Sequence, residues 1–151
     1  MYVYRLCRSP FATLDGDGSW LYGGRWNSPG RRIVYTSETL ALAALEALVH
    51  FAVDVAPTDL VALTIKIPDD LVHETIALAT LPAGWAQYVD TAECRVLGDR
   101  WADSGKTPLL RVPAAPVPQE HNILINAAHS ESSRIRVIEK RPFHFDPRLL
   151  K

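Results

Sequence analysis

The stretch VYTSETLALAALEALVH, residues 34–50, decides the fold class because it joins a strand pattern to a helix pattern. Ile33–Tyr35 is a short strand candidate, and Ser37 is able to cap the helix that follows. That helix is predicted over Glu38–Val53, where Ala and Leu, both strong helix formers, predominate. Its apolar residues lie nearly all round the helix, which indicates that it is buried.

Outside this stretch, strand and helix patterns do not alternate regularly. In LVALTIKI, residues 60–67, apolar and smaller or polar side chains alternate, with Val61, Leu63, Ile65 and Ile67 on one face, as in a strand with one covered face. Further strands are expected at Met1–Leu6, Leu109–Val112 and Ile135–Ile138, and a second helix from Asp90, with Glu93 as its capping-box partner, to about Trp101. The three prolines of PAAPVPQEHN, residues 113–122, predict a loop. The result is one compact, layer-packed α+β domain with a mixed or antiparallel sheet and flanking helices.

Composition narrows the classes of function. Sixteen basic and seventeen acidic residues leave a net charge of -1, so no general positive field exists to hold a nucleic acid. Arginines nevertheless outnumber lysines twelve to four, and arginine suits two-pronged contacts with a small anion such as phosphate. Cys7 and Cys94 form no zinc-binding pattern, so no metal is expected. With no signal peptide and no apolar run of about 18 residues, a cytoplasmic protein without a membrane contact is expected.

Three residues are candidates for chemistry. Glu46 is the only charged residue within Thr39–Val49, and an ionised carboxylate in apolar surroundings is costly unless something pairs with it. It either belongs to a thin solvent-facing stripe or is functional, and we favour the functional reading. Arg25 follows two glycines that let a ligand approach the backbone closely. Tyr35, before the helix, offers a ring for stacking and a polar hydroxyl. Spacings of ten and eleven residues allow one pocket to hold all three.

The C-terminal third adds a second group of polar residues. Asn122, Asn126 and His129 form an NxxxNxxH pattern that suits either turn structure or ligand contact. The chain also has histidines at 50, 121 and 129 together with arginines, so a ribonuclease remains an alternative function. The chain has no phosphate-binding GxxxxGK[ST] loop and no GxGxxG between a strand and a helix, so neither an ordinary nucleotide hydrolase nor a hydride-transfer enzyme is indicated.

Taken in order, these segments resemble the RES domain, a bacterial toxin family named after its Arg, Glu and Ser. The segments that carry the resemblance are YRL near the start, GGRWN at residues 23–27, the stretch at 34–50, LLRVP at 109–113, the NxxxNxxH segment and FHFDPRLL at the end. The resemblance covers nearly the whole chain, so residues 1–151 are expected to form a single RES domain.

The resemblance implies an enzyme that consumes NAD+ as its substrate, with a fold similar to that of ADP-ribosyltransferase toxins. Such enzymes cleave the bond between nicotinamide and ribose and pass ADP-ribose to water, phosphate or a target protein, and growth stops. By the same resemblance, Arg25, Glu46 and Tyr35 are catalytic. The resemblance also implies that Arg25 and Tyr35, with Arg5 and Asn122, bind NAD+. A cognate antitoxin is expected to cover the cleft in a hetero-oligomer, and any DNA binding would belong to the antitoxin.

One position departs from the family pattern. The usual VPS reads VPA here, so Ala114 stands where the namesake serine is expected. Three functions therefore stay open. They are an NAD+-consuming toxin, a ribonuclease-type toxin that uses histidine and arginine, and a catalytically silent binding protein.

Overall fold

The computed structural model describes residues 1–51, 56–87 and 92–150 of the chain. Seven strands are present in this part: β1 (Tyr2–Arg8), β2 (Ile33–Ser37), β3 (Leu60–Lys66), β4 (His73–Thr75), β5 (Leu109–Pro113), β6 (His121–Asn126) and β7 (Arg136–Pro142). The α-helices are α1 (Asp17–Tyr22), α2 (Leu40–Leu48) and α3 (Ala92–Ser104). Four short 3₁₀ helices span Ser9–Phe11, Leu78–Thr80, Ser130–Arg134 and Pro147–Leu150.

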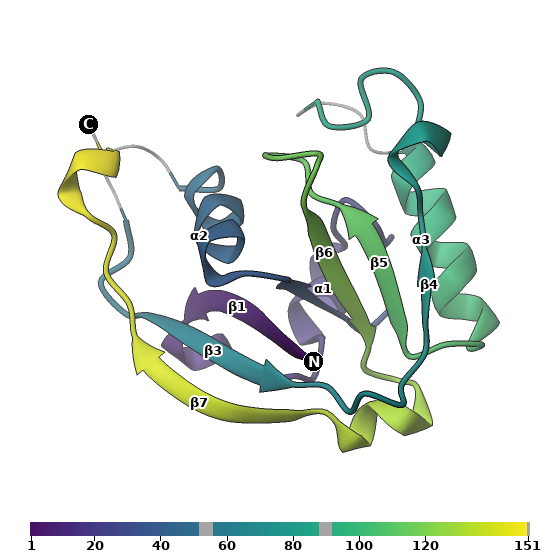
Figure 1. The fold of residues 1–151 in the computed structure, drawn as a ribbon, viewed down its shortest axis with the longest axis horizontal. Coiled ribbons are helices and arrows are strands. Elements are labelled where there is room, and N and C mark those ends of the chain that lie inside the picture. The colour runs from purple at the N-terminus through teal and green to yellow at the C-terminus, as the bar shows by residue number, and fades with distance from the viewer. Residues whose placement is uncertain (52–55, 88–91, 151) are drawn as a thin grey trace.

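All seven strands form one sheet in the order β4-β5-β6-β2-β1-β3-β7. The β4 and β5 pair is parallel, and every other neighbouring pair is antiparallel. Strand β1 pairs with β3 along its whole length but meets β2 only at Tyr4 and Ser37. The sheet therefore divides at the β1–β2 contact into two halves that run in different directions, as Figure 1 shows. The expected α+β fold with a mixed sheet is confirmed.

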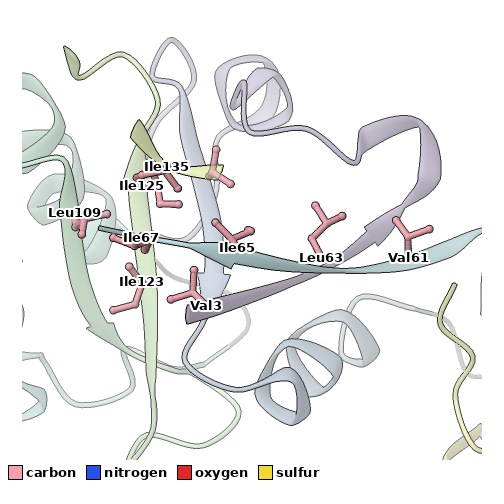
Figure 2. Close-up of a cluster of buried hydrophobic side chains, with 10 residues drawn as sticks. Val3, Val61, Leu63, Ile65, Ile67, Leu109, Ile123, Ile125 and Ile135 are labelled. Atoms are coloured by element: carbon pink, nitrogen blue, oxygen red, sulfur yellow. The ribbon is translucent and has the colours of Figure 1, made fainter. Parts of the chain in front are cut away.

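Two apolar clusters hold this fold together. The first gathers ten buried side chains from both halves of the sheet, among them Val3, Leu63, Ile65, Ile123 and Ile125, as Figure 2 shows. The predicted buried face is confirmed, because Val61, Leu63 and Ile65 of β3 and Ile67 just beyond it are at most 7% exposed. The second cluster lies between the β5–β6–β2 half and α3, with the side chains of Trp26, Trp85, Trp101 and Leu124 among its members. Since each burial stabilises the fold by roughly 1.5–3 kcal/mol per large side chain, both clusters contribute substantially.

Helix α2 differs from the prediction at both ends. It begins at Leu40, and its N-cap is Thr39, whose hydroxyl accepts a hydrogen bond from the Leu42 amide at 3.1 Å, so the assignment of the cap to Ser37 is wrong. It ends at Leu48, and the final residues of the predicted helix, 52 and 53, lie outside the described part. Leu45 and Val49 are exposed, so the helix is buried on one face rather than all round.

The other boundaries shift in ways that have physical causes. Strand β6 begins at His121, inside the segment predicted as a loop, because the prolines end at residue 118 and the backbone is then free to pair with β2 and β5. Strand β4 was not expected, since HET carries no apolar alternation. Helix α3 runs to Ser104, three residues beyond the expected end, and the predicted cap at Asp90 lies outside the described residues.

Candidate active site

The candidate site is organised around strand β2, which carries Tyr35 and Ser37. Alternate side chains of a strand point to the same face, so Tyr35 and Ser37 face the same way. In the register with β6, Tyr35 lies opposite Leu124 and Ser37 opposite Asn122. The face that carries Tyr35 therefore also carries Asn122, one of the predicted binding residues.

Glu46 lies on α2 with its side chain half-buried. The Asn122 Nδ2 donates a hydrogen bond to Glu46 Oε1 at 2.5 Å, and the Ser37 hydroxyl donates to Asn122 Oδ1 at 2.7 Å. An ionised carboxylate only accepts hydrogen bonds, so it fixes the amide with its nitrogen toward Glu46. Serine, asparagine and glutamate thus form a short chain of hydrogen bonds that runs from the sheet to the helix and holds the carboxylate in place.

Arg25 lies in a tight turn formed by Gly24–Asn27, which we call the arginine turn. The Gly24 amide donates to the Asn27 carbonyl at 2.8 Å, and the reverse bond is 3.4 Å long. The Nη1 of Arg25 donates to the carbonyl of Trp85 at 2.7 Å, and the guanidinium lies 6.0 Å from the centroid of the Trp85 ring. Within the described residues, no carboxylate forms an ion pair with this guanidinium. Among the described residues, its hydrogen-bond partners are the backbone carbonyls of Trp85 and Gln87.

Tyr35 joins β2 to the arginine turn. Its hydroxyl donates to Asn27 Oδ1 at 2.6 Å and accepts from the Trp26 amide at 3.1 Å. Burial raises the pKa of this hydroxyl well above its usual value, although the Trp26 amide and the charge of Arg25 oppose the rise. Tyr35 is therefore a neutral phenol at physiological pH.

The two groups of side chains lie on adjacent parts of one strand face. Tyr35 supports the arginine turn, and Ser37 supports the Asn122–Glu46 pair. Residues two apart on a strand are separated by about 7 Å, so the two hydrogen-bonded groups start from neighbouring positions on β2.

Arg5 lies apart from these two groups. It is on β1, next in sequence to the residue that pairs with Ser37, and its Nη1 donates to the Thr13 carbonyl at 3.0 Å. Burial raises the pKa of the nearby Cys7 thiol, and the charge of Arg5 partly offsets this rise. Among the described residues, no hydrogen bond links Arg5 to Arg25, Tyr35, Glu46 or Asn122.

The three histidines occupy separate places. His50 is exposed just beyond α2, and His129 caps the 3₁₀ helix at Ser130–Arg134, where its Nδ1 accepts from the Glu131 amide. His121 accepts from Arg111 Nη2 at 2.8 Å, and Arg111 Nε donates to Glu38 at 2.7 Å. Burial and the charge of Arg111 lower the pKa of His121, and Glu38 opposes this effect. No two of these histidines are hydrogen-bonded to each other in the described part of the chain.

Two residues at the site escaped the sequence analysis. Ser37 was assigned to the helix cap, and its bond to Asn122 depends on a pairing of strands 85 residues apart. Asn27, the last residue of GGRWN, is completely buried and bonds both to Tyr35 and to the turn. An asparagine three residues after a pair of glycines is the signal available for it, since such a segment is typical of a structured turn.

Ala114 and Asn126 are both buried and make hydrogen bonds that connect neighbouring segments of the fold. Ala114 follows β5 and is completely buried, and its amide donates to the Glu120 carbonyl at 2.9 Å. Asn126 is buried at the end of β6, where its Nδ2 donates to the Ala102 carbonyl and its Oδ1 accepts from the Ala128 amide. Asn126 therefore ties β6 to α3 and to the following turn.

The described residues contain neither a metal-binding cluster nor a membrane-spanning helix. No group of three or more histidine, cysteine, aspartate or glutamate side chains is arranged to share a metal ion. No helix in the same residues has the length and hydropathy needed to cross a bilayer.

The fold is shared with a known toxin–antitoxin structure. The chain superimposes on a chain of the crystal structure of the M. tuberculosis MbcT-MbcA toxin-antitoxin complex with a TM-score of 0.76 at 19% sequence identity, covering 99% of this chain and 86% of that chain. The molecule is thus an α+β domain of this fold.

Sequence comparison places the chain in a family. The family model described as the RES domain matches residues 2–146, and the chain belongs to this family. A protein of Sphingobium sp. (strain YBL2) named "Prs ADP-ribosylating toxin" is 36% identical over 140 residues, which cover 91% of this chain and 87% of the relative. A protein of Photorhabdus laumondii subsp. laumondii named "Toxin Res" is 35% identical over an alignment of 154 residues, covering 100% of this chain and 98% of the relative.

Proposed function

We propose that this protein is the toxin of a bacterial toxin–antitoxin system and that it consumes NAD+. It cleaves the bond between nicotinamide and ribose and transfers ADP-ribose to an acceptor, and growth then stops. Membership of the RES domain family supports this function, as do relatives named for ADP-ribosylation and toxicity. The single observation that carries the proposal is the half-buried Glu46, held by Asn122 beside the strand that also supports Arg25.

The chemistry follows from the bond that breaks. Nicotinamide leaves NAD+ as a neutral molecule, so the leaving group needs little acid catalysis. The barrier lies in the ribosyl group, which develops positive charge in an oxocarbenium-like transition state. Glu46 supplies a negative charge for that cation, directly or through a ribose hydroxyl, and can then accept a proton from the acceptor. Because Asn122 engages Oε1, Oε2 faces the substrate in this proposal.

The pyrophosphate is the natural partner for Arg25. Among the described residues, the carbonyls of Trp85 and Gln87 engage Nη1, and in this proposal Nε and Nη2 make a two-pronged contact with phosphate. Tyr35 is proposed to stack its ring against nicotinamide or ribose. Arg5 is proposed to add positive charge, and reaching the same ligand would require it to leave the Thr13 carbonyl.

The acceptor and the partner complete the proposal. Water, phosphate and a target protein are the candidate acceptors of ADP-ribose. We propose a cognate antitoxin that covers the cleft in a hetero-oligomer within the cytoplasm, with no metal and no direct nucleic-acid or membrane contact by this chain. The whole chain, residues 1–151, is proposed to act as a single RES domain.

Incubation of the purified protein with NAD+ tests the function. We expect release of nicotinamide, and mass spectrometry of the mixture is expected to identify ADP-ribose as a free product, as a phosphate ester or as an adduct on protein. Arg25→Ala is expected to weaken NAD+ binding, whereas Arg148→Ala, which removes an exposed arginine near the C-terminus, is the matched control. Intact NAD+ after prolonged incubation with the folded protein, together with cleavage of RNA, would instead favour the ribonuclease.

A further inference from the structure

Buried hydrogen bonds hold the arginine turn. Asn27 is completely buried, and its side chain uses both of its ends. Its Oδ1 accepts from the Tyr35 hydroxyl at 2.6 Å, and its Nδ2 donates to the carbonyls of Ser28 at 3.0 Å and Ser19 at 3.2 Å. A surface turn that only reverses the chain does not need a buried amide at its end, so these contacts indicate a turn that is held in one conformation.

The Tyr35 hydroxyl is fully occupied by this turn. It has a single proton, which it donates to Asn27, and it accepts the amide hydrogen of Trp26. Gly24 lies so close that a Cβ at this position would stand 2.6 Å from the hydroxyl oxygen. The hydroxyl therefore has no proton left for a substrate, and the backbone of the turn covers it.

Helix α3 holds the opposite side of the turn. A Cβ on Gly98 would lie 1.7 Å from the Trp26 carbonyl oxygen, so the helix and the turn are in direct backbone contact. The carboxylate of Asp99 accepts from the Ser28 amide at 2.8 Å and from the Ser28 hydroxyl at 2.7 Å. The turn is thus held between β2 and α3. Of its four residues, only Arg25 has a long side chain that extends away from this contact, since Trp26 is buried.

We propose that Asn27 and the Tyr35 hydroxyl are positioning residues that act on NAD+ only through Arg25. The hydroxyl of Tyr35 fixes the Trp26 amide and the Asn27 side chain, and these fix the backbone from which the guanidinium extends. This inference rests on the proposed function, in which Arg25 binds the pyrophosphate. It gives Asn27 a role in the reaction. It also states that the Tyr35 hydroxyl bonds to the arginine turn and not to the substrate.

The consequence for kinetics is specific. Tyr35→Phe keeps the ring and removes only the hydroxyl, which leaves the buried Trp26 amide and Asn27 Oδ1 each without a partner. The turn then becomes less rigid, and the Arg25 guanidinium is no longer held in the position at which it binds the phosphate. Loss of such buried hydrogen bonds corresponds to roughly a tenfold rise in KM. The value of kcat stays close to that of the wild type, because Glu46 is held by a separate set of bonds.

A double-mutant cycle tests the proposal. Nicotinamide release is measured for the wild type, Tyr35→Phe, Arg25→Ala and the double variant, with Tyr22→Phe as the matched control, since Tyr22 is 82% exposed beside the same segment. We expect Tyr35→Phe to raise KM in the wild type and to change nothing further in the Arg25→Ala background. An equal factor in both backgrounds, or an unchanged KM in Tyr35→Phe, would overturn the proposal. Asn27→Ala is expected to follow the same pattern.

A second readout keeps this inference separate from the proposed function. Backbone and Arg25 Nε resonances are followed by nitrogen NMR in the wild type, Tyr35→Phe and Tyr22→Phe, with no substrate present. We expect faster hydrogen exchange at the Trp26 amide and greater mobility at Arg25 Nε in Tyr35→Phe alone. Unchanged signals at both nitrogens would contradict the positioning role. If the wild type released no nicotinamide while these signals changed as expected, the proposed function would fail and the architecture of the turn would stand.

Discussion

The contact between Gly98 and the arginine turn gives the most quantitative prediction of the structure. In Gly98→Ala the new methyl group would lie 1.7 Å from the Trp26 carbonyl oxygen and 2.8 Å from its carbonyl carbon. Both partners belong to the backbone, so no change of rotamer relieves the overlap. An ordinary van der Waals contact of 3.4 Å or more requires α3 to move away from the turn, which strains the two hydrogen bonds between Asp99 and Ser28.

The magnitude follows from two opposing effects. Overpacking of a tight contact costs about 1–3 kcal/mol, and the upper end applies because only backbone movement relieves it. Alanine gains about 1 kcal/mol over glycine in helix propensity. The net loss in the free energy of unfolding is therefore about 2 kcal/mol. For a chain of this length that corresponds to a fall in Tm of roughly 4–8 °C.

Thermal unfolding followed by circular dichroism measures this effect. Gly18→Ala is the matched control, because Gly18 also lies in a helix and nothing lies within 4 Å of the site of its Cβ. We expect Gly18→Ala to keep or slightly raise the Tm, since only the propensity gain applies. NAD+ turnover is expected to fall in Gly98→Ala through a higher KM. A Tm for Gly98→Ala equal to or above that of the wild type would refute the close packing of α3 on the turn.

Three further predictions concern α2 and its surroundings. Thr39→Ala is expected to lower the free energy of unfolding in urea by about 1 kcal/mol, because it removes the cap of α2; wild-type stability would contradict this. Ser37→Ala leaves Asn122 Oδ1 without its donor, so nicotinamide release is expected to fall by about tenfold, and an unchanged rate would remove Ser37 from the site. Because the pKa of His121 is lowered in the folded state, acid favours unfolding as the pH falls below about 6.5. His121→Gln, whose carbonyl accepts from Arg111, is expected to lose less stability between pH 7.5 and 5; an equal loss would exclude His121 as the cause.

Local patterns predicted those parts of the fold that local physics determines. The alternation of residues 60–67 identified β3 and its buried face, because a strand with one covered side must alternate. The Ala and Leu content located α2. The cap was assigned two residues too early because Ser37 and Thr39 are both good caps, and only the pairing of Ser37 with β1 and β6 shows that it ends a strand.

The parts that escaped prediction depend on distant residues. Strand β6 was overlooked because the prolines before it suggested a loop, while its pairing with β2 spans about 90 residues of sequence. The bond between Glu46 and Asn122 joins residues 76 apart, so an unusual charge in an apolar helix identified the carboxylate without identifying its support. Likewise, GGRWN indicated a special turn, but only the three-dimensional packing of Tyr35 and α3 explains why it holds one conformation.

The most direct test of the account is nicotinamide release from NAD+ by the wild type and by Glu46→Gln. Glu93→Gln, which removes an exposed carboxylate from α3, is the matched control, and circular dichroism verifies that all three proteins are folded. Because the glutamine is nearly isosteric but carries no charge, we predict that Glu46→Gln loses turnover by at least about a hundredfold while Glu93→Gln keeps the wild-type rate. Full turnover by a folded Glu46→Gln protein would contradict the central claim that this carboxylate stabilises the ribosyl cation.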